Sequence, residues 1–197
     1  MIAISNPRQG HWDAALRILR YLKSSPGQGI FLPADNPLDL HVYCDSDWAS
    51  CPMSRRSLTG YLVKLGHAPI AWKTKNQVTV SRSSAEAEYR AMANATSELV
   101  WIRNLLMFLG LPVAPARLYC DNQAALHIAN NPVFHERTKH IEVDCHFVRE
   151  RILSGILTPE YLPTHEQLAD IFTKALGRRQ FHHLLGKLGV SRLHAPT

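Results

Sequence analysis

Acidic residues follow the ends of two apolar segments that have the composition of β-strands. The segment LDLHVYC runs directly into Asp45 and Asp47, and the segment ARLYC runs directly into Asp121. In open α/β sheets, ligands bind outside the carboxyl ends of parallel strands. If the two strands are parallel neighbours, Asp45 and Asp121 lie side by side there, and their mutual repulsion calls for a cation. Asp47 lies beyond the strand and is interpreted as a loop acid near the site.

A third acid lies on the segment from Ser83 to Leu109, whose apolar residues recur at helical spacing. One turn before the first of these residues, the same stripe reaches Glu88, which is therefore expected to face the sheet. Glu86 points elsewhere and has capping-box spacing from Ser83. The alternative is that Glu88 is solvated in a frayed first turn, where the helix dipole favours it. The apolar stripe is Met92, Ala95, Leu99, Ile102 and Leu106.

The fourth acid, Asp170, lies in the segment THEQLADIFTKAL, where the spacing of Thr164 and Gln167 predicts the start of a last helix. Two alternatives do not involve a shared site: Asp170 pairs with Lys174 one turn later, and Asp121 caps the helix that follows it. If the acids converge, Mg²⁺ is the natural ion to bind there, because it prefers carboxylate oxygens as ligands. Two such ions, about 3.5–4 Å apart, would activate a water and stabilise the leaving oxygen of a phosphodiester.

The remaining pattern predicts a mixed α/β sheet that positions these acids. Three strand-like segments with short links indicate an antiparallel meander, and the later strands are single, short and separated by helices. The expected strands are 38–44, 57–66, 69–74, 116–120 and 156–163. The expected helices are 11–25, 83–109, 121–130, 141–153 and 164–176.

The composition indicates a globular protein with a polyanionic partner. The 197 residues include 22 Lys and Arg against 16 Asp and Glu, a formal charge of +6, and a pI near 9.3. Such an excess favours nucleic acid as a partner, although an ordinary basic protein shows it too. No apolar run approaches the roughly 18 residues of a membrane span, and no signal peptide is evident. The four cysteines contain no CxxC pair, so reduced thiols in an intracellular compartment are expected.

Seven motifs in one order carry a resemblance to a known family. Together they resemble the ribonuclease H region of Ty1/copia-type retrotransposon Pol polyproteins, from about Asp39 to Leu176. The segment HWDAALRILRYLK resembles the end of the reverse transcriptase, and no YxDD polymerase motif is present. The resemblance implies a helix and linker over 1–36, a ribonuclease H-like domain over 37–177 and a tail over 178–197. The motifs are YCDSDWA, RRSLTGYLV, AWKTKNQ, SSAEAEYRA, YCDNQAAL, ERTKHIEVDCHFVRE and QLADIFTKAL.

This resemblance implies a ribonuclease H-like fold and a specific chemistry. The fold is a five-stranded mixed sheet, with three antiparallel strands followed by two parallel to the first, flanked by helices. The implied activity is hydrolysis of the RNA strand of RNA–DNA hybrids with two Mg²⁺ or Mn²⁺ ions. The implied partner is the reverse transcriptase portion of the same polyprotein, with no membrane and no small-molecule cofactor, in the cytoplasm or in virus-like particles. The implied catalytic and metal-binding residues are Asp45, Glu88, Asp121 and Asp170.

The sequence departs from the family at one loop and leaves the nucleic-acid contacts less specific. Many relatives have a Gly-rich loop with a catalytic His before the last helix, but LPTHEQ leaves no room for it. His165 is the only nearby candidate for proton transfer. Basic residues in loops and on the third strand are candidate phosphate contacts, or simply solvated charges. They are Arg55, Lys73, Lys75, Arg137, Lys139 and His140.

Three other functions compete with a ribonuclease. An integrase or transposase would place its Glu after Asp121, where only Glu142 and Glu150 are available. A zinc module would need ligands that here lack CxxC or HxxxH spacing. An inactive relic or nucleic-acid-binding module would keep the fold without turnover. The zinc candidates are His135, His140, Cys145 and His146.

Overall fold

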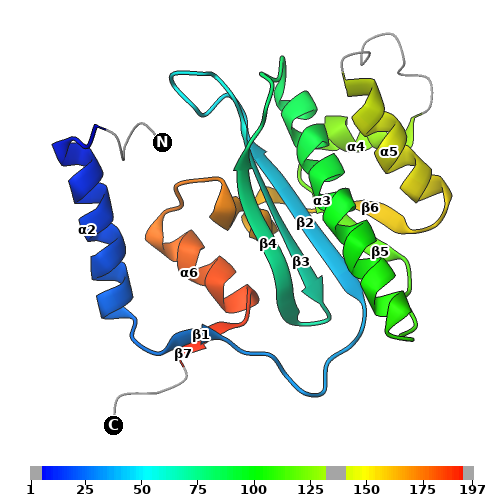
Figure 1. The fold of residues 1–197 in the computed structure, drawn as a ribbon, viewed down its shortest axis with the longest axis horizontal. Coiled ribbons are helices and arrows are strands. Elements are labelled where there is room, and N and C mark those ends of the chain that lie inside the picture. The colour runs from blue at the N-terminus through cyan, green and yellow to red at the C-terminus, as the bar shows by residue number, and fades with distance from the viewer. Residues whose placement is uncertain (1–5, 132–140, 193–197) are drawn as a thin grey trace.

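A five-stranded mixed sheet forms the centre of the protein (Figure 1). The computed structural model describes residues 6–131 and 141–192. The sheet order is β4-β3-β2-β5-β6, in which β3 is antiparallel to both β2 and β4, and β5 is parallel to both β2 and β6. This confirms the predicted sheet. The strands are β2 (Leu40–Asp47), β3 (Leu58–Leu65), β4 (Ala68–Asn76), β5 (Ala116–Cys120) and β6 (Leu157–Tyr161).

The central strand β2 is covered on both faces near its end. Its first half alternates between buried and half-buried residues, but Cys44, Asp45 and Ser46 are all buried. Residues that alternate along a strand point to opposite faces, so both faces are packed at this point. The carboxylate of Asp45 is therefore buried at a point where both faces of a sheet are usually apolar. Asp47, predicted to lie beyond this strand, is its last residue.

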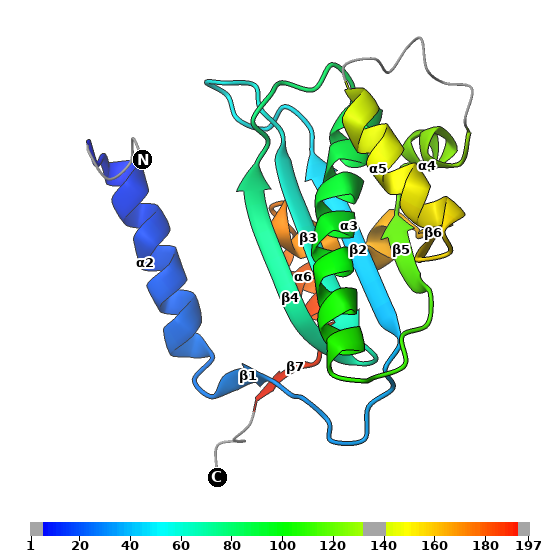
Figure 2. The ribbon, with the colours of Figure 1, turned by 45° about the vertical axis from the view of Figure 1, so that its right-hand side comes forward.

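One face of the sheet is covered by α3 (Ser84–Phe108), with α4 (Gln123–Asn130) and α5 (Glu142–Leu153) beside it (Figure 2). The helix α3 begins where the sequence predicts, because the Ser83 hydroxyl accepts the Glu86 N–H at 3.2 Å. The predicted stripe is confirmed as well. Met92, Ala95, Leu99 and Ile102 are buried in the main core, and Leu106 packs at its edge.

The last predicted helix, over 164–176, is wrong in type. Residues 164–172 form two 3₁₀ turns on the face of the sheet opposite to α3. These are η2 (Thr164–Glu166) and η3 (Leu168–Phe172), with an extended Gln167 between them. The buried Gln167 amide donates to the Cys44 carbonyl at 3.0 Å and to the Tyr119 carbonyl at 3.4 Å. This anchor joins the ends of β2 and β5 and prevents Gln167 from continuing a regular helix.

The segment after residue 177, interpreted from the sequence as a tail, contains regular structure. The helix α6 (Arg178–Lys187) buries Leu184 against Leu62 and Leu168, and Leu188 joins the same small core. The strand β7 (Val190–Arg192) then pairs with β1 (Gln28–Ile30) in a separate two-stranded sheet. The apolar spacing of Phe181, Leu184, Leu185 and Leu188 is the sequence signal for this helix.

The N-terminal helix α2 (Gln9–Ser24) stands apart from the sheet (Figure 1). None of its residues is buried. It touches α6 through the rings of Tyr21 and Phe181, whose centroids are 5.8 Å apart. Among the described residues, no helix is both long and apolar enough to cross a membrane.

Candidate active site

The four predicted acids come from four different elements and converge at the carboxyl ends of β2 and β5. Asp45 lies near the end of β2, Asp121 directly after β5, Glu88 in the second turn of α3 and Asp170 in η3. One oxygen each from Asp45, Asp121 and Asp170 lie within 4.8 Å of one another. Asp121 also belongs to a second group at the same spacing, with Glu88 and the Cys120 thiol. Asp121 therefore joins the two groups into one cluster.

Neither local alternative explains Glu88 or Asp121. Glu88 is only 6% exposed, and its carboxylate accepts the Ser46 N–H at 3.2 Å, so it is not solvated in a frayed turn. Asn122, rather than Asp121, caps α4, because its side chain accepts the Ala125 N–H. The Asp121 carboxylate instead accepts the Thr164 hydroxyl at 2.8 Å. Both acids are thus directed into the cluster.

For Asp170, the ion-pair interpretation and the cluster interpretation both hold. Lys174 binds Asp170 at 2.8 Å, as the spacing of four residues suggests. The same ammonium also binds Asp45 at 3.0 Å, across to β2. The Thr173 hydroxyl donates to the other oxygen of Asp45. Sequence reasoning missed this second contact of Lys174 and the role of Thr173.

Burial and mutual repulsion raise the pKa of several groups in the cluster. The pKa of Glu88 is raised well above its ordinary value, first by burial and then by the Cys120 thiol and the Asp45 and Asp121 carboxylates. Burial also raises the pKa of Asp170 to about 6, although its bond to Lys174 opposes this shift. Glu88 and Asp170 are therefore expected to stay protonated to a higher pH than ordinary carboxyl groups do.

The cluster suits hard divalent cations. Asp45, Asp121 and Asp170 supply an all-oxygen donor set, and Glu88 and Asp121 supply carboxylates to the second group. Magnesium and manganese prefer such oxygen ligands. A divalent ion would also offset the repulsion that raises the pKa of Glu88. The residues thus fit a divalent metal site.

The predicted proton-transfer residue belongs to neither metal-type group found among the described residues. His165 has a side chain that is 72% exposed, and its ring lies 3.7 Å from the Glu166 carboxylate. Its neighbour Thr164 provides the contact between η2 and Asp121. Thr164, which sequence reasoning used only as a helix cap, is thus the residue of this turn that touches the candidate site.

Three of the six predicted nucleic-acid contacts lie in the described part of the chain. Lys73 and Lys75 are exposed on β4, and Arg55 is exposed in the connection between β2 and β3. Arg137, Lys139 and His140 lie outside the described residues, as does His135 of the zinc hypothesis. The two glutamates that an integrase would require, Glu142 and Glu150, lie on α5. Glu142 pairs with His146, and Glu150 pairs with Arg151. Neither glutamate belongs to the two metal-type groups found among the described residues.

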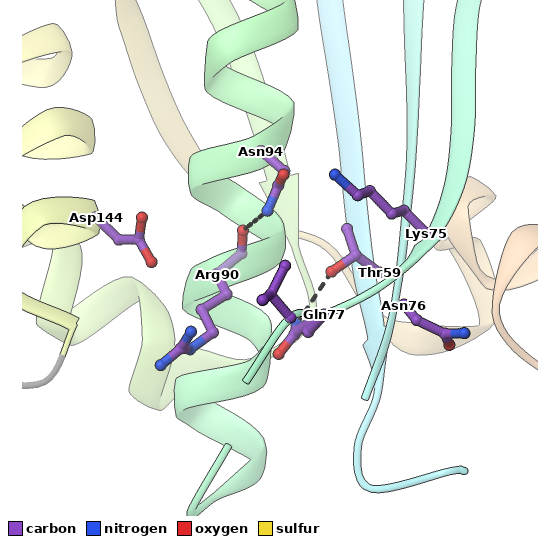
Figure 3. Close-up of a pocket in the computed structure, with 8 residues that line it drawn as sticks. Thr59, Lys75, Asn76, Gln77, Arg90, Asn94 and Asp144 are labelled. Carbon is purple, nitrogen blue, oxygen red and sulfur yellow. Dashed lines mark hydrogen bonds between the residues drawn. The ribbon is translucent and has the colours of Figure 1, made fainter. Parts of the chain in front are cut away.

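A polar pocket of about 200 Å³ lies between β4, α3 and α5 (Figure 3). Lys75 and Arg90 line it from opposite sides. The Gln77 amide, at its floor, donates to Ala87 O at 2.9 Å and to the Ser46 hydroxyl at 3.4 Å. Because the Ser46 N–H binds Glu88, the pocket is adjacent to the acid cluster. Arg90 is a lining residue that sequence reasoning missed, and its guanidinium pairs with Glu86 at 2.9 Å.

No family model matches the chain. It is, however, 48% identical over 188 residues to the retrovirus-related Pol polyprotein from transposon RE2 of Arabidopsis thaliana, covering 95% of this chain. It is 36% identical over 178 residues to the corresponding polyprotein from transposon TNT 1-94 of Nicotiana tabacum, covering 90% of this chain. The chain belongs to the copia-type Pol family. It spans 13% of the length of either relative.

A solved structure supports the fold of this Pol segment. The N-terminal RNase H domain of a Mycobacterium tuberculosis protein, solved as a fusion with maltose-binding protein, matches with a TM-score of 0.51. The match covers 76% of this chain and 97% of that one at 13% identity. At this identity the likeness concerns the fold alone. Together with the sheet order, it shows that this Pol segment has the RNase H-like fold.

Proposed function

We propose that this chain is the ribonuclease H part of a copia-type Pol polyprotein and cleaves the RNA strand of RNA–DNA hybrids. The observation that carries the proposal is the junction at Asp121, which belongs to both groups of metal-type ligands at the ends of β2 and β5. Asp121 would therefore belong to the ligand sets of two neighbouring cations. The fold and the Pol relatives support the same activity.

In this proposal, Asp45, Asp121 and Asp170 would hold one divalent ion, and Glu88 with Asp121 would hold the other. When bound, two such ions supply an activated water and a stabilised leaving oxygen at the phosphodiester. The chain itself fixes the ligands. The Ser46 N–H orients Glu88, and the Thr164 hydroxyl orients Asp121. Partners that orient metal ligands in this way contribute strongly to metal sites.

The substrate backbone would run past β4. Lys73 and Lys75 are exposed there, and Lys75 lines the polar pocket beside the cluster (Figure 3). Neither lysine has an ion pair within the described residues. Their charge is therefore available for phosphate oxygens, which supply most of the affinity of nucleic-acid complexes. Arg55 extends the same basic contribution on the β2–β3 connection.

The upstream reverse transcriptase portion of the same polyprotein is the proposed protein partner. Trp12, Leu19 and Leu22 on α2 are between 59% and 63% exposed, although a helix this short depends on packing for stability. The full-length relatives contain far more chain than this segment. An upstream domain that covered these residues would supply the missing packing.

A cleavage assay tests the proposed activity. The substrate is an RNA–DNA hybrid with a labelled RNA strand, in buffer that contains Mg²⁺. The variants are Asp121→Asn and a matched control, Asp47→Asn, at the carboxyl end of β2. Asp121→Asn is expected to lower the rate by at least about a hundredfold, because even residues that only orient metal ligands contribute about 10–100-fold. Asp47→Asn should retain most of the rate. Equal cleavage by wild type and Asp121→Asn would contradict the proposal.

A second candidate is a module that binds hybrids without cleaving them. It is favoured by one observation: both oxygens of Asp45 are already engaged, one by Lys174 and one by Thr173. The same assay separates the two functions. The binding module predicts salt-sensitive hybrid binding, weakened by Lys75→Ala but not by Lys23→Ala, with no cleavage above the Asp121→Asn background.

A further inference from the structure

Lys174 places an ammonium group inside the acid cluster. Its Nζ lies 2.8 Å from Asp170 Oδ1 and 3.0 Å from Asp45 Oδ1. The two carboxylates are almost fully buried, at 4% and 0% exposure, whereas the lysine side chain is 33% exposed. Lys174 therefore reaches from the surface to two buried acids that come from different elements.

The oxygens that Lys174 binds belong to acids that form the all-oxygen metal group. Asp45 and Asp170, with Asp121, make up that group. The Thr173 hydroxyl takes the other oxygen of Asp45, so this acid has no unengaged oxygen. A divalent ion held by Asp45 and Asp170 would have to share these oxygens with the ammonium or replace it.

Charge balance explains why a cation lies there. Buried carboxylates close together repel one another, and a buried charge without a counter-ion is strongly destabilising. No other Lys or Arg pairs with the four acids within the described residues. Lys174 is thus their direct basic partner in that part of the chain. Its flexible stem and partial exposure allow it to move out without disturbing the core.

We propose that Lys174 is a built-in counter-ion that holds Asp45 and Asp170 in position until a divalent metal replaces it. This inference rests on the proposed function, because it assumes that a metal binds these acids. Its consequence is competition: Lys174 stabilises the metal-free protein and weakens the binding of Mg²⁺. If Lys174 instead stays in place and positions Asp170 for the metal, its removal weakens metal binding. The two roles therefore predict opposite changes in affinity.

Melting temperatures measured against Mg²⁺ concentration, without nucleic acid, distinguish these roles. In chelator, Lys174→Met should melt below wild type. Its half-saturating Mg²⁺ concentration should be about tenfold lower, an estimate for removing one adjacent, partly exposed unit charge. Lys174→Arg keeps the charge and should resemble wild type, as should Lys23→Met on the distant helix α2. Unchanged or weaker Mg²⁺ binding by Lys174→Met would overturn the proposal.

A second measurement uses the wild-type chain and remains informative if Lys174→Met does not fold. With lysine labelled by ¹³C and ¹⁵N, the Lys174 ammonium signal should move toward that of solvent-exposed lysines as Mg²⁺ is added. A Lys174 signal that stays unchanged while other site resonances shift would overturn the counter-ion role and leave the ribonuclease proposal standing. No Mg²⁺ effect by either readout would overturn both.

Discussion

Asp45 and Asp170 share the ammonium of Lys174, whereas Glu88 and Asp121, in the same cluster, have hydrogen-bond donors but no cationic partner within the described residues. The first pair has a counter-ion at 3.0 and 2.8 Å. For the second pair, the donors are the Ser46 N–H, the Thr164 hydroxyl and the Cys120 thiol. A neutral donor orients a carboxylate but does not cancel its charge. One half of the cluster thus has a counter-ion in the metal-free protein, whereas in the other half burial and neighbouring groups raise the pKa of Glu88.

The largest expected effect on stability comes from breaking the half that has the counter-ion. In chelator, Asp45→Asn should lower the free energy of unfolding by about 2 kcal/mol, a figure reduced for the partial exposure of Lys174. The variant leaves Lys174 with one partner and puts an amide where the Thr173 hydroxyl donates. Urea unfolding measures this change. Stability equal to that of wild type would show that the ion pair contributes nothing.

The opposite sign is expected in the other half. In chelator near neutral pH, Glu88→Gln should raise the free energy of unfolding by about 1 kcal/mol, because it removes a carboxyl whose ionisation is opposed by burial and by neighbouring groups in the folded chain. The pKa of Glu88 is higher in the folded than in the unfolded chain, so the penalty is absent below its ordinary value of 4.5. This penalty grows as the pH rises above 4.5 and reaches its full size above the raised pKa of Glu88.

A pH series checks this sign. The gain from Glu88→Gln over wild type should therefore shrink as the pH falls toward about 5. Mg²⁺ should reverse the order, because only wild type then keeps both carboxylates for the metal. A variant that is less stable than wild type at every pH in chelator would contradict the comparison.

Much of this site could be predicted from local patterns. The strand ends fixed the positions of Asp45 and Asp121, and helical periodicity directed Glu88 to the sheet. The contact of Lys174 with Asp45 could not be predicted, because it joins residues 129 positions apart. The two 3₁₀ turns were missed for a related reason: Gln167 leaves the helical pattern to bind carbonyls of β2 and β5. The helix α6 had an amphipathic pattern of its own, but it lay beyond the segment that resembles the family.

A smaller effect separates two neighbours in η2. Thr164→Val should lower the rate of hybrid cleavage by about tenfold, because the hydroxyl orients Asp121, a proposed metal ligand. His165→Ala should change the rate by less than about threefold, because its ring is largely exposed and belongs to neither metal-type group found among the described residues. Single-turnover cleavage rates compare them. A loss with His165→Ala as large as that with Thr164→Val would restore its proposed role in proton transfer.

The smallest effect is expected from removing α2. A chain that begins at Gln28 keeps the β1–β7 pairing and loses only a helix without buried residues. Its free energy of unfolding should fall by about 1 kcal/mol or less, the contribution of one aromatic pair such as Tyr21 with Phe181. Thermal unfolding measures it. If the shortened chain does not fold, α2 is an integral part of the domain.

The most direct test of the central claim is a crystal structure with Mn²⁺, located by its anomalous scattering. The account predicts two peaks about 3.5–4 Å apart. Asp121 should lie between them, with Asp45 and Asp170 at one ion and Glu88 at the other. The Lys174 ammonium should have left Asp45. Peaks elsewhere on the chain, or none at saturating Mn²⁺ with Lys174 still bound to both acids, would contradict the account.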